Sequence, residues 1–234
     1  MANKLYDQVI TIKSIDVFNS LWIAWLNLFN NPPKKESILC LLAQSALETN
    51  RWKSIHCYNF GNIKSRDGDG RDYTFFACNE IMPLKMAQDY VSKSPSLAKI
   101  TSIRNDGKAI VWFYPEHPAC RFRAFKTINE GAIDYLSFLQ TKYKKAWNAI
   151  LDGDVCKFSH ELKINGYYTA DESSYTKGLK SLFDEFSKLP IDIDTLPILS
   201  SVQTEQLQNL VTLTLQESYS DSSENSSSNN DEPS

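Results

Sequence analysis

The sequence predicts a mainly α-helical domain with a small β segment inserted between its helices. Apolar residues recur at three- and four-residue steps near both ends of the first 190 residues. Between these regions, short runs rich in aromatic residues are bounded by Gly, Asp and Pro, as is typical of short strands. The chain has 234 residues, of which 42% are hydrophobic, and this is enough for one sizeable core.

The first part of the chain predicts two helices. Residues 3–30 carry apolar side chains at helical spacing, and the run Asn30-Asn31-Pro32-Pro33 ends that helix. Residues 36–49 form the second predicted helix. Its apolar positions cover nearly the whole circumference, which indicates a central, buried helix.

The middle part predicts the β segment. Residues 50–82 are irregular, with the turn SRDGDGRD leading into the strand-like YTFFACNEI. Asp67, Asp69 and Asp72 are expected to form this turn. Residues 83–105 are expected to begin as a helix and continue as a loop, and residues 109–125 predict two short strands around a Pro-bounded turn.

The last part of the domain returns to helical spacing. Helices are predicted over 127–142, 143–151, 154–164 and 171–188, with NGYYT joining the last two. Asp171 has the position and chemistry of a helix N-cap.

The charge pattern predicts a boundary near Pro190. Residues 190–234 contain eight acids and no Lys or Arg, whereas residues 1–189 carry 20 acids and 25 bases, a formal charge of +5. We expect one domain over 1–189 and an acidic extension over 190–234. About the last 18 residues are low in complexity and are expected to be disordered.

Composition narrows the class of protein. No run reaches about eighteen consecutive apolar residues, so a membrane span is not expected, and the N-terminus lacks a secretory signal pattern. The mildly basic domain suits an anionic polymer such as a cell wall or nucleic acid, but no basic stripe favours nucleic acid. The acidic extension is interpreted as a docking or solubility element.

Metal and cofactor sites are not expected. The three histidines are far apart in sequence, the five cysteines show no CxxC spacing, and no phosphate-binding glycine loop is present. Cys78 and Cys120 flank the middle segment and are expected to pair only if the protein matures in an oxidising compartment.

Glu48 is the first candidate for chemistry. It lies in the last turn of the predicted helix 36–49, where the helix dipole disfavours a carboxylate, and apolar neighbours would further desolvate it. Both effects raise the pKa of a carboxyl group, as a general acid working near neutral pH requires. The alternative is an ordinary helix-end glutamate paired with Arg51 or Lys53, and the position alone favours that alternative.

The segment YNFGNIK, residues 58–64, suggests a carbohydrate ligand. It combines amides with aromatic rings and a glycine, and rings and amides together suit sugars that carry N-acetyl groups. The alternative is an Asn/Gly loop with core aromatics, and the segment by itself does not decide between the two.

Four segments taken together resemble a known family. They are AQSALETN, NFGNIK, FRAFKTINEGAIDYL and NGYYTADESSY, and they follow one another in the family's order over residues 36–185. The pattern resembles the bacterial and phage glucosaminidases, which are peptidoglycan hydrolases of lysozyme-like fold related to flagellar and autolysin enzymes. The resemblance implies a lysozyme-like helical domain with an inserted β-lobe. The long segment between Glu80 and Arg121 implies that this lobe is elaborated.

The resemblance also implies roles for particular residues. Glu48 corresponds to the general acid that protonates the glycosidic oxygen, and Tyr167 to an active-site tyrosine that orients the substrate or stabilises the transition state. The residues expected to bind substrate are Gln44, Trp52, Tyr58, Asn59, Phe60, Lys64, Glu116 and Tyr168.

The second carboxylate is open. Glycosidases usually carry a partner acid that activates water or forms a covalent intermediate. Glu80 stands where the family's β-lobe acid tends to occur and is the first choice, and Glu116 is the second. A substrate-assisted route, with the 2-acetamido group as nucleophile, removes the need for either.

The expected function is cleavage of the β-1,4 glycan backbone of peptidoglycan, most closely as an endo-β-N-acetylglucosaminidase. A muramidase or lytic transglycosylase of the same fold, and a non-catalytic wall-binding module, are the alternatives. The expected partner is the glycan strand, and delivery as a phage lysin, virion-associated enzyme or secreted effector would bring the protein to the wall.

Overall fold

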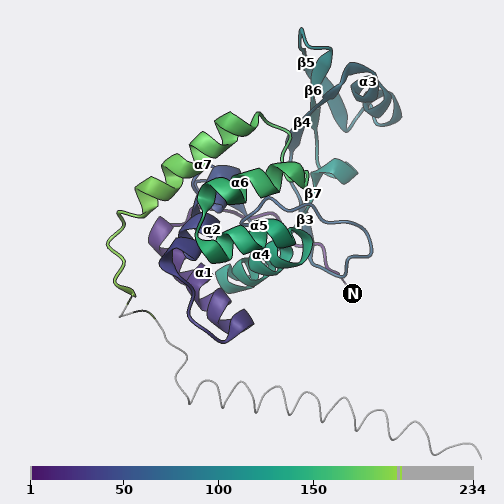
Figure 1. Cartoon of the computed structure of the whole chain (residues 1–234). Helices are drawn as coiled ribbons and strands as arrows, with labels where there is room; N and C mark the ends of the chain where they lie inside the picture. The colour runs from purple at the N-terminus through teal and green to yellow at the C-terminus, as the bar shows by residue number, and fades with distance from the viewer. Residues whose placement is uncertain (1, 194–195, 197–234) are drawn as a thin grey trace, which may run out of the picture. The chain divides into compact units, whose positions relative to one another are not determined.

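The computed structural model describes residues 2–193 and 196, coloured in Figure 1. Residues 2–193 belong to a compact unit that runs from Met1 to Asp194. The boundary expected near Pro190 stays a prediction. The expected disorder of the last residues concerns positions that lie outside the described residues.

The order of elements confirms a mainly α-helical fold with an inserted β segment. In chain order the described residues form β1 (Val9–Ile10), α1 (Ser14–Phe29), α2 (Lys35–Glu48), β2 (Ile55–His56), β3 (Tyr73–Phe75), β4 (Cys78–Pro83), α3 (Leu84–Lys93), β5 (Ala98–Ile103), β6 (Lys108–Phe113), the short 3₁₀ helix η1 (Pro118–Cys120), β7 (Arg121–Arg123), α4 (Ile128–Lys142), α5 (Lys144–Asp152), α6 (Val155–Ile164) and α7 (Glu172–Phe186).

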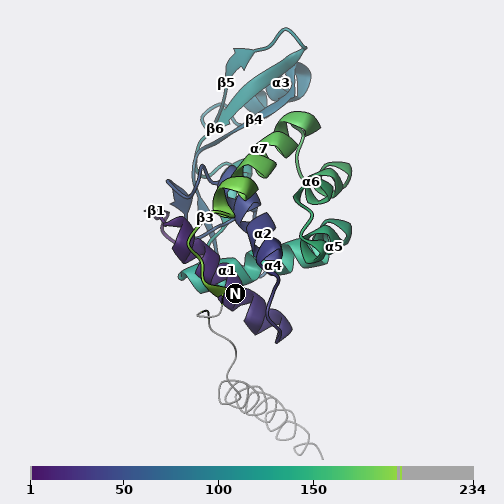
Figure 2. The same ribbon diagram turned by 60° about the vertical axis from the view of Figure 1, so that its left-hand side comes forward.

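Helix α2 is the centre of the helical part. Every residue from Ser37 to Ala46 is buried, as its all-round apolar sequence predicts. It packs against α1, α5 and α7, and Figure 2 shows it surrounded by them. Its C-terminal end is therefore held from several sides, which fixes the position of Glu48.

The inserted segment forms a small lobe of its own. Strands β4, β6 and β5 make an antiparallel sheet in that order, and α3 packs on it. Met82, Val111 and Phe113 belong to the lobe's separate core. Figures 1 and 2 both show this lobe at one end of the unit, beyond the helices. The pair β3–β7 lies at its base and joins it to the helical part.

The N-terminal helix predicted over 3–30 is wrong in its first third. Helix α1 begins only at Ser14, and the residues before it are extended. Val9 and Ile10 pair with β2, and Leu5 donates its backbone N–H to the carbonyl of Tyr73. The apolar residues of this segment are spaced as in a helix, but the segment is extended because it pairs with strands that are distant in sequence.

The loop predicted in the second half of 83–105 is also wrong, because residues 98–103 form β5. This edge strand carries polar side chains and pairs with β6 through a bulge between Ile100 and Ser102. The helix in the first half is confirmed by α3. The additional helix and strand provide the elaborated lobe that the long segment implied.

The close approach of α4 to the 58–62 loop yields a stability prediction. A Cβ atom on Gly131 would lie 2.1 Å from the carbonyl oxygen of Tyr58, whereas one on Gly178 would meet only Leu47 at 3.5 Å. We expect Gly131→Ala to destabilise the fold by about 1–3 kcal/mol through overpacking. Gly178→Ala in α7 should be neutral or stabilise by up to about 1 kcal/mol. Urea unfolding of both variants tests this, and equal stabilities would contradict the close packing.

Candidate active site

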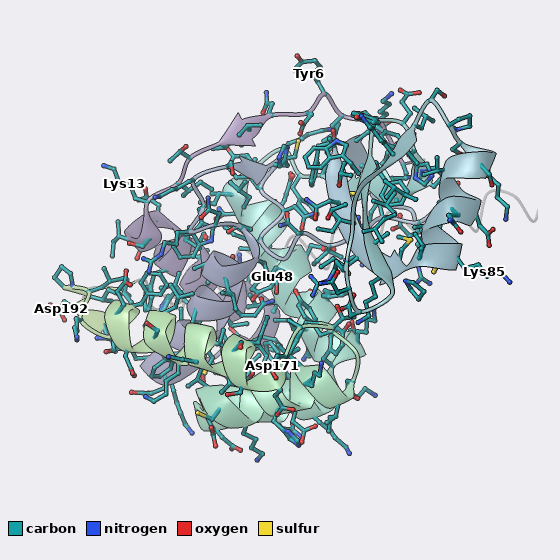
Figure 3. The ribbon with its side chains drawn as sticks, turned by 90° about the horizontal axis from the view of Figure 1, so that it is seen from above. Tyr6, Lys13, Glu48, Lys85, Asp171 and Asp192 are labelled. Atoms are coloured by element: carbon teal, nitrogen blue, oxygen red, sulfur yellow. The ribbon has the colours of Figure 1, made fainter. Side chains whose placement is uncertain are left out.

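Glu48 is the last residue of α2, and its side chain has partners on two helices. Its Oε1 atom accepts hydrogen bonds from the hydroxyl of Tyr175, at 2.9 Å, and from the Nε2 amide of Gln44, at 3.3 Å. Figure 3 shows Glu48 next to α7, the helix that begins after Asp171 and supplies Tyr175. The simpler alternative is wrong, because Arg51 pairs with Glu185 instead and the ion pairs found among the described residues include none between Glu48 and Lys53.

Burial raises the pKa of the Glu48 carboxyl above its usual value. The hydrogen bonds from Tyr175 and Gln44 stabilise the ionised form and therefore act in the opposite direction, without cancelling the effect of burial. The neutral acid is thus favoured to a higher pH than in an exposed glutamate. This is the electrostatic property of a group that donates a proton near neutral pH.

Gln44 joins Glu48 to two further tyrosines. Its Nε2 atom also donates to the hydroxyl of Tyr167, at 2.7 Å, and its Oε1 atom accepts a hydrogen bond from Tyr135. Tyr167 in turn donates to the carbonyl of Gly61. Burial raises the pKa of both tyrosines well above the usual value, so both remain neutral donors. Gln44 is buried and braces the site internally, which corrects its expected contact with substrate.

A cleft of about 600 Å³ opens at Glu48. It is lined by Glu48, Gly61, Asn62, Ile63, Lys64, Arg66, Asp69, Glu80, Arg123, Phe138, Lys142, Tyr143 and Tyr167. The residues come from the end of α2, the loop after β2, the lobe, helix α4 and the loop after α6. The cleft therefore brings together Glu48, Glu80, Tyr167 and Lys64, four of the residues singled out from the sequence.

Glu80 reaches the cleft from strand β4. Its Oε1 atom lies 3.3 Å from the ammonium nitrogen of Lys64. The same ammonium group lies 3.9 Å from the centre of the Phe122 ring and donates to the carbonyl of Ala119. These contacts fix the Lys64 side chain, and Lys64 in turn orients the Glu80 carboxylate toward the cleft.

Aromatic rings form another wall of the cleft. The ring of Tyr143 lies edge-on to Phe138, at 5.6 Å between centroids, and to Tyr167, at 5.3 Å. Helix α4 supplies Phe138, the junction of α4 and α5 supplies Tyr143, and the loop after α6 supplies Tyr167, so the wall depends on how the helices pack. Aromatic side chains offer an apolar face together with, in tyrosine, a polar edge, and both suit a sugar ring.

Three residues expected to bind substrate are buried elsewhere. Trp52 is only 1% exposed, donates its indole N–H to Ser45 and packs on Phe186. Asn59 uses its amide to hold the backbone of residues 63 and 123. Phe60 lies in the core beside Tyr135. The expectation of substrate contact is wrong for these three, because aromatic and amide side chains also serve core packing and loop bracing.

The remaining candidates lie outside the cleft. Glu116 is exposed and pairs with Lys4, which removes it as the second carboxylate of this cleft. Tyr168 stacks on Tyr175 at 3.7 Å and bonds to Ser159. Tyr58 does not line the cleft and instead supports α4 through its backbone at Gly131.

The sequence reasoning missed several residues of the site. Tyr175 follows the GYYT motif closely and is not among the residues predicted for the site, yet it contacts Glu48 directly. Arg123 belongs to the FRAF motif and lines the cleft, where Asp134 anchors it at 2.8 Å. The motifs contained both signals, whereas the contributions of Phe138, Lys142 and Tyr143 have no signal apart from helical spacing.

Two absences apply to the described part of the chain. Within residues 2–193 no group of His, Cys, Asp or Glu is arranged to hold a metal ion. Among the helices of the same residues, none is long and apolar enough to cross a membrane.

Comparison with known proteins gives only distant likenesses. The sequence matches no protein-family model and no curated protein. Among solved structures, a truncated glycoside hydrolase domain of FlgJ from Salmonella typhimurium is 18% identical, with a TM-score of 0.43 over 76% of this chain and 99% of that chain. The catalytic domain of the autolysin Auto from Listeria monocytogenes is 16% identical, with a TM-score of 0.42 over 74% and 84%. A mutant peptidoglycan hydrolase from Sphingomonas sp. A1 is 16% identical, with a TM-score of 0.42 over 83% and 98%.

The hydrogen bond from Tyr175 to Glu48 yields a prediction about acidity. Tyr175→Phe removes a donor that stabilises the carboxylate, so the pKa of Glu48 should rise further. Carboxyl ¹³C NMR titration of the variant measures this directly. Tyr168→Phe is the matched control, because the Tyr168 hydroxyl bonds to Ser159 and not to Glu48. A pKa that falls or stays constant in Tyr175→Phe would show that this bond is not formed in solution.

Proposed function

We propose that this protein is a peptidoglycan hydrolase that cuts the β-1,4 glycan backbone, with Glu48 as the general acid. The observation that carries the proposal is a partly buried carboxyl with a raised pKa, held by Tyr175 and Gln44, at the wall of a cleft. The segments AQSALETN and NGYYTADESSY, which resemble those of the family, support it, because their residues Gln44, Glu48 and Tyr167 are joined in one hydrogen-bond network.

In this mechanism Glu48 protonates the oxygen of the scissile glycosidic bond. Bond cleavage develops positive charge on the sugar ring, in an oxocarbenium-like transition state. Protonation of the leaving oxygen by a positioned acid typically contributes about 10²–10⁴ in rate. Tyr167 lies in the same cleft and orients the sugar through its ring or its hydroxyl.

Glu80 is proposed as the second carboxylate. Glu80 lines the same cleft from strand β4 of the lobe, whereas Glu48 lines it from the helical part, and Lys64 orients Glu80. In this role it activates the water that completes hydrolysis or stabilises the developing positive charge. The substrate-assisted route remains the alternative, because the acetamido group of the substrate can act as the nucleophile in its place.

The charge of the cleft favours an anionic glycan. Lys64, Arg66, Arg123 and Lys142 line it together with the acids Glu48, Asp69 and Glu80, so bases outnumber acids by one, and burial favours the neutral form of Glu48. Peptidoglycan carries carboxylates on its stem peptides, so basic side chains along the cleft suit it better than a neutral polysaccharide. The ring wall of Phe138, Tyr143 and Tyr167 would contact the apolar faces of the sugars.

We assign the cleaved bond to the reducing side of N-acetylglucosamine, because the motifs resemble those of endo-β-N-acetylglucosaminidases. A muramidase would use the same acid to hydrolyse the bond on the reducing side of muramic acid. A lytic transglycosylase would use it to cleave that bond without water as the acceptor. A non-catalytic glycan-binding module would keep the cleft but have no need of a proton donor.

We place the protein's action at the cell wall, after release or export as a bacteriolytic lysin or effector.

The role of Glu48 is tested by digesting purified peptidoglycan, reducing the products with borohydride and identifying the ends by mass spectrometry. We expect reduced N-acetylglucosamine ends from the wild type and a loss of about 10²–10⁴ in rate for Glu48→Gln. Glu116→Gln is the matched control, because that carboxylate lies outside the cleft on Lys4. Full activity of Glu48→Gln would refute the assignment.

The ends also distinguish the alternatives. Reduced muramic ends would indicate a muramidase, and anhydromuramic ends a transglycosylase. Absence of fragments from several wall types would favour the binding module.

The role of Glu80 is tested separately with Glu80→Gln. If Glu80 activates water, the rate should fall by about 10²-fold or more while wall binding in a pull-down stays normal. If the acetamido group is the nucleophile, the rate should fall only slightly. Comparable activity of Glu80→Gln and wild type would therefore remove Glu80 from the chemistry and leave Glu48 in place.

A further inference from the structure

Two cysteines meet beside the cleft, at the start of the strand that carries Glu80. Cys78 is the first residue of β4, and Cys120 is the last residue of η1. Both are free thiols, and their sulfur atoms lie 3.9 Å apart. A disulfide requires about 2.05 Å, so the two side chains need only a small further approach. The backbones are already joined here, because the N–H of Phe76 donates to the carbonyl of Cys120.

The surroundings of Cys78 favour its ionised form. The Cys120 thiol is in hydrogen-bonding contact with its sulfur and is positioned to donate to the thiolate, and the ammonium nitrogen of Lys64 lies 3.5 Å from the same sulfur. The hydrogen bond from Cys120 is the larger cause and the Lys64 charge a further one. Partial burial and the nearby Glu80 carboxylate raise the pKa of Cys78, but the two favourable contacts outweigh them. The net effect lowers the pKa of Cys78 to about 7. A thiol with this pKa is partly thiolate at neutral pH and is a competent nucleophile.

The two cysteines have different properties, as an attacking and a resolving thiol require. Cys78 is partly exposed, whereas Cys120 is buried. The bond to Cys78 and burial raise the pKa of Cys120, so it stays protonated until Cys78 has reacted. When Cys78 is ionised, the carbonyl of Ala119, which accepts from Cys78 in the thiol form, still has Lys64 as a donor. Ionisation therefore leaves no buried carbonyl unsatisfied.

The other cysteines lack these features. Cys40 is buried, and burial raises its pKa to about 12. Cys57 is also buried, and its pKa is raised for the same reason. Cys156 is exposed on α6, and the thiol with which it interacts is that of the buried Cys40, whose pKa is raised. The reactive pair is therefore specific to the base of the lobe.

We propose that Cys78 and Cys120 form a thiol–disulfide exchange site whose co-substrate is a small-molecule disulfide. The Cys78 thiolate attacks one sulfur of the disulfide RSSR, forming a mixed disulfide and releasing RS⁻. Cys120 then loses its proton and attacks the sulfur of Cys78, forming the Cys78–Cys120 disulfide and releasing the second RS⁻. Two protein thiols are oxidised, one RSSR is reduced to two thiols, and the two protons pass to the released thiolates.

The site is separate from the proposed hydrolysis, and its chemistry does not depend on that function. Its product would tie the start of β4 to η1 and remove the thiolate charge from Lys64, which also contacts Glu80. Oxidising compartments favour the closed form and reducing ones the open form. The proposed site thus makes the base of the lobe responsive to the thiol–disulfide balance of its surroundings.

The test uses the folded full-length chain with Cys156→Ser, which removes the exposed single thiol. The probe is 5,5′-dithiobis(2-nitrobenzoic acid), whose released thiolate is measured by absorbance. We expect two equivalents per chain, a final mass two hydrogens below that of the reduced chain, and a Cys78–Cys120 linked peptide after digestion. Dithiothreitol should restore the starting mass. Two retained adducts, or no reaction in the folded state, would overturn the proposal.

Second variants in the same background separate the two roles. Cys120→Ser should release one equivalent and retain one adduct on Cys78, whereas Cys78→Ser should lose the rapid reaction. Lys64→Gln should react more slowly at pH 7 and Glu80→Gln more rapidly, because their charges act on the Cys78 thiolate in opposite directions. Circular dichroism verifies that each variant is folded. Equal reaction of the two cysteine variants would refute the assigned order of attack.

Discussion

The hydrogen-bond network around Gln44 and Glu48 is the constraint on which the rest of the fold depends. Both residues lie on α2, where Gln44 is fully buried and Glu48 is partly buried at the wall of the cleft. A buried polar atom without a partner costs about 1–3 kcal/mol. The partners come from three other places: Tyr135 from α4, Tyr167 from the loop after α6 and Tyr175 from α7. These elements must therefore converge on the end of α2 for the helix to be buried at all.

This network is difficult to explain by stability alone. An apolar residue at position 48 would need no partner, whereas the carboxyl is held at a raised pKa by burial and requires Tyr175 and Gln44. Buried charges in proteins are a weak source of stability and frequently mark a functional site. The arrangement therefore has the character of a site maintained at some cost to the fold, as a proton donor is expected to be.

The sequence predicted those parts of the fold in which local pattern and tertiary packing agree. The central helix α2, the four C-terminal helices and the N-cap Asp171, which accepts the N–H of Ser174, are examples. The extended N-terminus and strand β5 were not predicted, because their partners lie far away in sequence and their own spacing is ambiguous. Local pattern carries no information about such pairings.

The candidate site shows the same division. Glu48, Glu80, Lys64 and Tyr167 were found from motifs and do share one cleft. Trp52 and Phe60 were misplaced, because an aromatic residue beside a motif has the same sequence signature in the core as in a cleft. Whether a ring packs on Phe186 or faces solvent depends on helix α7, which is more than a hundred residues away.

Lys64 connects the two kinds of chemistry at the base of the lobe. Cys78 and Glu80 are two residues apart on β4, so their side chains lie on the same face of the sheet. One ammonium group contacts both, at 3.5 Å from the sulfur and 3.3 Å from the carboxylate. A change of charge on the sulfur therefore alters the field that Lys64 and Cys78 together exert on Glu80. The position of Glu80 also depends on Cys78, because β4 begins at Cys78, where the strand lies beside η1. The lobe thus carries its carboxylate on a strand whose first residue can change both its charge and its covalent attachment.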